Sequence, residues 1–100
     1  MPFTQYYRHY LSLHQNPICR RLHVLGLLIG VAVFTCCVLS PHWRLRLFAP
    51  LLAPAAGYAF AWIGHFFFEH NTPATWKNPV YAFRADLNMT WDVLRGRIKL

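Results

Sequence analysis

The sequence predicts an all-α membrane protein, a two-span antiparallel helical hairpin with an amphipathic interfacial helix at each terminus. Composition is the first reason: hydrophobic residues fill 56% of the 100 positions and charged residues only 13%, about half of the ~25% usual in soluble proteins. Two long apolar runs in the middle of the chain are the second. The third is the helical spacing of apolar residues in the segments before and after them. At this length, residues 1–100 are expected to form a single membrane domain.

The first element is expected to be an amphipathic helix over residues 3–15 that lies on the membrane surface. Its aromatic residues recur at helical spacing, and His14 ends the face that should turn toward the rest of the protein. Asn16-Pro17 should stop the helix, because the residue before a proline is pushed out of helical geometry.

Two membrane spans are expected at 22–39 and 47–68, since each is apolar over about the length that crosses a bilayer. Small residues follow one face of each run, and such residues let two helices approach closely. Pairing these faces gives an antiparallel hairpin. His23, at the start of one span, and His65, at the end of the next, should then lie at the same depth.

The last element is expected over 79–95, where Asn78 can cap a helix that begins with Pro79. Its apolar stripe is flanked by arginines, so it should lie in the interface instead of spanning the membrane. Asp86 lies at the edge of the apolar face, from which it can reach the hairpin or remain on the surface.

The formal net charge is +7. Basic residues flank the apolar segments without forming one continuous patch, which favours lipid headgroups over nucleic acid as partners. Eight of the ten Lys and Arg lie before the first span or after the second, so both termini should face the cytoplasm. The protein is therefore expected in the inner membrane of a bacterium or the endoplasmic reticulum of a eukaryote. Whether it forms a homo-oligomer stays open.

Three histidines, His14, His23 and His65, should converge near one membrane level, with Glu69 one helical turn beyond His65. Imidazole and carboxylate together suit first-row transition metals, and two histidines with one carboxylate are typical of non-haem Fe(II) oxygenases; zinc stays open. Asn16, Asn71 and Asp86 are available to orient the ligands. His70 points about 100° away from Glu69 around a helix and is a weaker candidate.

Much of the chain resembles the small membrane proteins related to the yeast 2-hydroxy fatty acid dioxygenase. The residues that carry the resemblance are Tyr6-Tyr7, His14-Gln15-Asn16-Pro17, His23 with Gly26, Trp62 to Glu69, Asn71, Pro73-Ala74, Pro79, Tyr81, Asp86 and Met89. The resemblance implies an Fe(II)-dependent dioxygenase that shortens a 2-hydroxy fatty acid by one carbon.

By this resemblance the family's histidines fall on His14, His23 and His65. Glu69 and Asp86 are the candidate catalytic carboxylates, and the candidate residues around substrate and metal are Asn16, Asn71, Arg20, Arg21 and Lys77. The partners implied are O2 and a fatty acyl substrate, whose carboxylate a cation at headgroup level could neutralise. The tail would stay in the bilayer or in a groove beside Phe66 to Phe68.

Two other classes of function remain open from the sequence. One is a membrane metal- or haem-binding protein without oxygenase activity, and the other is a structural helical hairpin whose histidines are merely interfacial.

Overall fold

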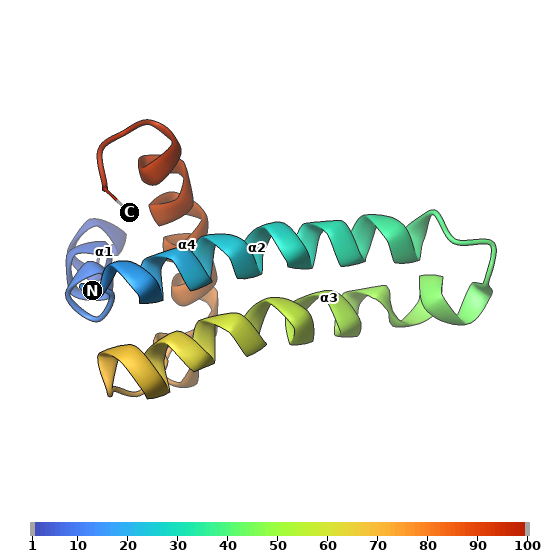
Figure 1. Cartoon of the computed structure of the whole chain (residues 1–100), viewed down its shortest axis with the longest axis horizontal. Coiled ribbons are helices and arrows are strands. Elements are labelled where there is room, and N and C mark those ends of the chain that lie inside the picture. Colours follow the sequence, from blue (N-terminus) through green and yellow to red (C-terminus); the bar gives the residue numbers. More distant parts are fainter. Residues whose placement is uncertain (1, 100) are drawn as a thin grey trace.

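A computed structural model describes residues 2–99, and every regular element in this range is helical. The elements are α1 (Phe3–Ser12), α2 (Pro17–Val38), α3 (Trp43–Ile63), the π-helix η1 (Gly64–Glu69), the short 3-10 helix η2 (Ala74–Trp76) and α4 (Pro79–Leu94). Figure 1 shows α2 and α3 side by side along the length of the molecule, with α1 and α4 gathered at one end.

The boundary between the first two helices is set by Asn16-Pro17. The first helix ends at Ser12 instead of residue 15, and α2 already begins at Pro17, before the apolar run at 22–39. The side chain of Asn16 caps α2, because its Oδ1 accepts a hydrogen bond from the backbone N–H of Ile18 at 2.8 Å. A proline at the first helical position fits this start, since its missing N–H needs no partner there.

The second long helix also starts earlier than the apolar run at 47–68, and it continues through Pro50 and Pro54. Its α-helical geometry stops at Ile63, where the wider π-helix η1 takes over through Glu69. His70, with φ of 57°, is in the left-handed conformation and ends η1. The second apolar segment is therefore one continuous rod whose last turn has a different pitch.

Glycines set the distance between α2 and α3. A Cβ atom added to Gly26 would lie 2.5 Å from the carbonyl oxygen of Gly57, and one added to Gly30 would lie 3.2 Å from that of Ala53. The two backbones are thus in direct contact and run in opposite directions. Such an approach is open only to residues with little or no side chain.

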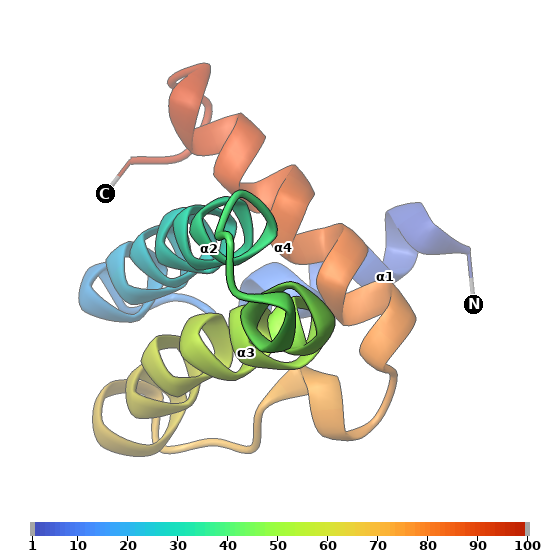
Figure 2. The ribbon, with the colours of Figure 1, turned by 90° about the vertical axis from the view of Figure 1, so that its right-hand side faces the viewer.

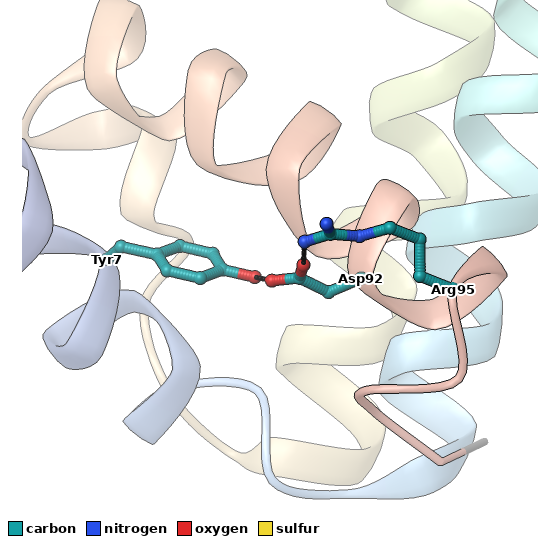
Figure 3. Close-up of polar contacts among 3 residues, drawn as sticks. All are labelled: Tyr7, Asp92 and Arg95. Atoms are coloured by element: carbon teal, nitrogen blue, oxygen red, sulfur yellow. Dashed lines mark hydrogen bonds and ion pairs between the residues drawn. The ribbon is translucent and has the colours of Figure 1, made fainter.

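A polar contact and an aromatic cluster join α1 to α4. The Tyr7 hydroxyl donates to Oδ2 of Asp92 at 2.7 Å, and Arg95 donates to Oδ1 of the same carboxylate at 2.7 Å (Figure 3). Tyr6 and Tyr10 are buried in a cluster with Ala82, Ala85 and Met89. This packing carries the end of α1, and with it His14, toward the hairpin.

Helix α4 turns two alanines and a methionine inward and most of its large apolar residues outward. Ala82, Ala85 and Met89 are buried, whereas the apolar stripe that includes Val80 and Trp91 is exposed. Figure 2 shows α4 crossing beside the paired α2 and α3. The stripe is available to a surrounding apolar phase because the contact with the protein uses the opposite, alanine-rich face.

Both long segments, Pro17–Val38 and Trp43–Glu69, are long and apolar enough to cross a membrane. At 1.5 Å per residue, α2 is about 33 Å long, which matches the ~30 Å hydrocarbon core of a bilayer. Only 17% of the most apolar stretch of each segment is buried within the protein. A core helix of a soluble protein would bury most of its apolar surface, so this surface needs a partner outside the chain.

Candidate metal centre

Three buried histidines meet where α1, α2 and η1 come together. His14 lies in the link after α1, His23 lies in the second turn of α2, and His65 lies in η1. Their exposed fractions are 0%, 5% and 2%. The three rings stand nearly perpendicular to one another, with centroids 4.4 to 4.9 Å apart. One ligand atom from each lies within 4.8 Å of the others, so the group could hold a metal ion.

The Nδ1 atoms of all three rings face oxygen acceptors. Nδ1 of His14 lies 2.7 Å from the carbonyl oxygen of Tyr10, and Nδ1 of His23 lies 2.9 Å from that of Cys19. Nδ1 of His65 lies 2.6 Å from Oδ1 of Asn71, whose amide orientation is fixed because its Nδ2 donates to the Leu13 carbonyl at 3.1 Å. A carbonyl oxygen can only accept, so each Nδ1 carries the hydrogen.

This tautomer leaves a lone pair on every Nε2. The Nε2 atoms of His14 and His23 are 3.0 Å apart, and two lone pairs at this distance repel unless a cation lies between them. Metal–nitrogen bonds of 2.0–2.1 Å place adjacent ligand nitrogens about 3.0 to 3.4 Å apart. Histidine ligands commonly donate their other N–H to a carbonyl or carboxylate group, as all three do. The residues therefore fit a bound transition-metal ion.

Protonation of His14 is strongly disfavoured. Burial lowers its pKa to about 2, nearby His23 acts in the same direction, and the hydrogen bond to the Tyr10 carbonyl opposes them. The ring of Tyr10 also stacks on that of His14, with centroids 3.9 Å apart. A neutral imidazole is the form that binds metals, so this ligand needs no deprotonation near neutral pH.

The π-helix η1 sets the orientation of His65 toward the other two histidines. Single π-turns are rare and occur often at functional sites. The backbone N–H of Asn71 donates to the carbonyl of His65 at 3.1 Å, which folds the chain after η1 back onto the histidine. A Cβ at Gly64 would lie 2.9 Å from Sγ of Cys19, so the glycine lets η1 reach the start of α2.

A small cavity of about 20 Å³ adjoins the three histidines. This is enough for one water-sized guest. Among residues 2–99, Nε1 of Trp62 and Oδ1 of Asp86 are buried without a hydrogen-bond partner, and both residues line this cavity. Burial raises the pKa of Asp86 to about 7, and a hydrogen bond from Tyr10 opposes the rise. Orphaned polar atoms of this kind indicate a place for a bound molecule.

The other predicted site residues differ in their relation to this group. The Glu69 carboxylate accepts a hydrogen bond from the backbone N–H of Asn16 and is not part of the histidine group. Nε of Arg20 donates to the carbonyl of His14 and so supports the loop that carries it. Arg21 and Lys77 are exposed, as are the remaining histidines His9, His42 and His70.

Two residues of the cavity wall, Tyr58 and Trp62, were not identified from the sequence. A signal for Tyr58 was present, because it precedes His65 by two helical turns and is polar within an apolar run. Trp62 begins a stretch that carries the family resemblance, but the sequence predicted no role for its nitrogen, since tryptophan is ordinary in membrane segments.

Comparison with protein families matches residues 1–98 to the family described as "2-hydroxy-palmitic acid dioxygenase Mpo1-like". The match confirms the resemblance inferred from the residues. Searches of the curated proteins and of the solved structures gave no significant match.

Proposed function

We propose that this chain, which belongs to the Mpo1-like family of 2-hydroxy-palmitic acid dioxygenases, is a membrane-bound Fe(II)-dependent dioxygenase that shortens 2-hydroxy fatty acids by one carbon. The observation that carries the proposal is the trio of buried histidines whose Nδ1 atoms all donate and whose Nε2 atoms converge. A ferrous ion, when bound, supplies the one-electron chemistry that lets O2 react with an organic acid.

The proposed role of His14, His23 and His65 is to hold the ion through Nε2. Three neutral imidazoles leave the charge of a divalent cation uncompensated, which favours an anionic ligand beside them. The carboxylate of a 2-hydroxy acid has that charge, and its neighbouring hydroxyl can lie on the same side. Arg20, Arg21 and Lys77 remain candidates to guide the carboxylate toward this end of the molecule.

The two unpartnered atoms beside the cavity can contact the hydroxyl of such a head group, the part that a space for one water-sized guest admits. Trp62 offers an N–H donor, and Asp86 offers an oxygen that can accept the 2-hydroxyl hydrogen. We assign Asp86 to the substrate hydroxyl. Glu69 keeps Asn16 and the start of α2 against η1, so its proposed part is to position the ligands.

The overall reaction balances without a separate reductant. Oxidation of the 2-hydroxy carbon to a carboxyl group and release of C1 as carbon dioxide remove four electrons from the substrate. One O2 accepts these four electrons, and its two atoms supply the two oxygens that the products hold in excess of the substrate. The products are the acid one carbon shorter, carbon dioxide and water.

The proposed setting is a bilayer crossed by α2 and by α3 with η1, both termini facing the cytoplasm. Support comes from the length and exposed apolar surface of these segments. Eight basic residues lie on the side of the site, and two, Arg44 and Arg46, lie at the other end, in the first turn of α3.

The test is to load the purified protein with Fe(II) under nitrogen, add 2-hydroxypalmitate, admit O2 and follow the products by mass spectrometry. Formation of the 15-carbon acid is expected in the wild type and in His42→Ala, whose histidine is exposed, but not in His65→Ala. Failure of the iron-loaded wild type to form this acid would overturn the proposal.

Metal analysis and absorption spectra of the protein as purified, before Fe(II) is added, separate the alternative classes. A Soret band would indicate haem, zinc at one equivalent with no iron would indicate a different metal, and no metal in the wild type would favour a purely structural hairpin.

A further inference from the structure

A second, larger hollow lies along the hairpin. It has a volume of about 450 Å³, within the ~300–1,000 Å³ range of small-molecule sites. Small residues form its floor: Gly26 and Gly30 on α2, and Ala53 and Gly57 on α3. On α3 it extends from Pro50 to Ala61, about 16 Å at 1.5 Å per residue.

The groove adjoins the metal centre. Tyr58, Ala61 and Asp86 line both the groove and the small cavity beside the histidines. Asp86, which has an unpartnered buried oxygen, therefore borders both spaces. From there the groove runs toward the α2–α3 turn, to Phe34 and Pro50.

The chemistry of the groove changes along its length. Its end near the histidines has the Tyr58 hydroxyl and the Asp86 carboxyl, and the rest of its lining is apolar. Its side walls are open, since Val31 is 58% exposed and Phe34 45% exposed on helices whose surroundings we propose to be lipid. One polar end and a long apolar remainder match an amphiphile with a single alkyl chain.

We propose that this groove binds the alkyl tail of the substrate, with its acid head at the histidines and its far end at Phe34 and Pro50. The inference rests on the proposed function for the identity of the head group. It moves the tail away from Phe66 to Phe68, which are exposed and do not line the groove. Val31 and Phe34 become determinants of chain length, because they border the space that the last carbons fill.

The first experiment maps the tail directly. A 2-hydroxy C16 acid with a diazirine at the end of its tail is irradiated with the wild-type protein in lipid nanodiscs, and the labelled residues are identified by mass spectrometry. Labelling is expected at Val31, Phe34 and Pro50, and an excess of unlabelled 2-hydroxypalmitate should suppress it. Equal labelling of Leu28, which is exposed on α2 and does not line the groove, or suppression by phospholipid alone would overturn the inference.

The second experiment fills the groove. In Val31→Trp the indole should overfill the space that the tail occupies, so binding of the C16 acid should weaken about tenfold, which is within the usual cost of overpacking. Leu28→Trp is the matched control, because Leu28 is also 58% exposed on α2 but lies outside the groove. It should bind within twofold of the wild type.

Chain length gives an independent readout. Wild-type affinity should rise with each added methylene and level off once the tail reaches Phe34, and Phe34→Ala should extend this rise to longer acids. Phe48→Ala, on an exposed phenylalanine of α3 outside the groove, should leave the profile unchanged. An identical profile in Phe34→Ala and Phe48→Ala would count against the inference.

These measurements do not depend on turnover. If the iron-loaded protein fails to shorten the acid but the labelling and the Val31 effect are found, the groove inference stands and the proposed reaction falls. If the acid is shortened while Val31→Trp behaves as Leu28→Trp in binding and labelling, the reaction stands and the groove inference falls. A dimer whose second copy covers Val31 and blocks labelling would also overturn it.

Discussion

The two ends of the hairpin place different chemistry between the same two segments. At the end with η1, His14, His23 and His65 are buried, and each Nδ1 has a hydrogen-bond partner in its own part of the chain. Toward the turn, α2 and α3 touch through glycine and alanine, and large apolar side chains are exposed. Glycine allows the close approach at both ends, at Gly64 and at Gly26, but only the first end has buried polar side chains between the segments. The difference shows how so short a chain can combine a polar centre with a surface suited to lipid.

The largest effect is expected from the polar end. His65→Ala should abolish tight binding of a divalent metal, because the variant loses one of the three converging ligand nitrogens and leaves an empty space in its place. His42→Ala, near the turn, should bind as the wild type does. Isothermal titration of the metal-free proteins with Fe(II) under nitrogen measures both, and equal affinities in the two variants would remove the distinction between the ends.

The next largest effect is expected where the backbones touch. Gly26→Ala gains about 1 kcal/mol in helix propensity, but its Cβ would lie 2.5 Å from a backbone oxygen that cannot rotate away. Overpacking of this kind costs up to about 3 kcal/mol, so a net loss of about 2 kcal/mol is expected.

Gly30→Ala is the control for this prediction, since its Cβ would meet Ala53 at 3.2 Å. The gain and the cost should nearly cancel there. Unfolding of both variants in mixed micelles gives the comparison, and equal stability of the two would show that α2 and α3 are not in backbone contact at Gly26.

A smaller effect is expected around His65. Asn71→Leu removes the acceptor for Nδ1–H of His65 and the donor to Leu13. Loss of such an orienting partner typically costs 10- to 100-fold in metal affinity. Asn71→Asp keeps an acceptor for the ring and should retain more of the affinity. The same metal titration measures the affinity of both variants. A lower metal affinity in Asn71→Asp than in Asn71→Leu would contradict the tautomer in which Nδ1 of His65 carries the hydrogen.

The smallest effect concerns the link between α1 and α4. Tyr7→Phe removes the hydrogen bond to Asp92 and should cost about 1 kcal/mol of unfolding free energy at pH 7. Hydrogen bonds from Arg95 and Tyr7 lower the pKa of Asp92. A lowered folded-state pKa contributes stability above the unfolded value of about 3.9, which is lost as pH falls through the folded value.

The cost of Tyr7→Phe should therefore be constant from pH 5 to 7 and shrink below about pH 4. Chemical unfolding of the wild type and the variant across this range measures it. A cost that grows on acidification would contradict the role of the Asp92 carboxylate.

The choice of the three clustered histidines could be predicted from the sequence, whereas the π-helix that carries one of them could not. Helical spacing and the two apolar runs were enough to choose His14, His23 and His65 from six histidines, because membrane segments fix depth along their axes. The π-helix was not predictable, since Gly64 to Glu69 has no composition that separates it from an α-helix.

The orientation of α4 shows a different limit. Its large apolar stripe marks a face that avoids water, but the sequence does not say whether lipid or protein covers it. The structure turns Ala82, Ala85 and Met89 inward. The groove was missed for the same reason: small residues indicated close packing of two helices, and they provide that packing and also leave space beside it.

The hydrogen-bond partners of the three Nδ1 atoms determine which missense mutations can disturb the metal centre. Two of them, at Tyr10 and Cys19, are main-chain carbonyls four residues before the histidine that they orient. Any amino acid at those positions supplies the same oxygen, so a codon change there cannot delete it. Only Asn71 contributes a side chain. Among these three orienting contacts, position 71 is thus the one where a single missense change removes the acceptor atom itself.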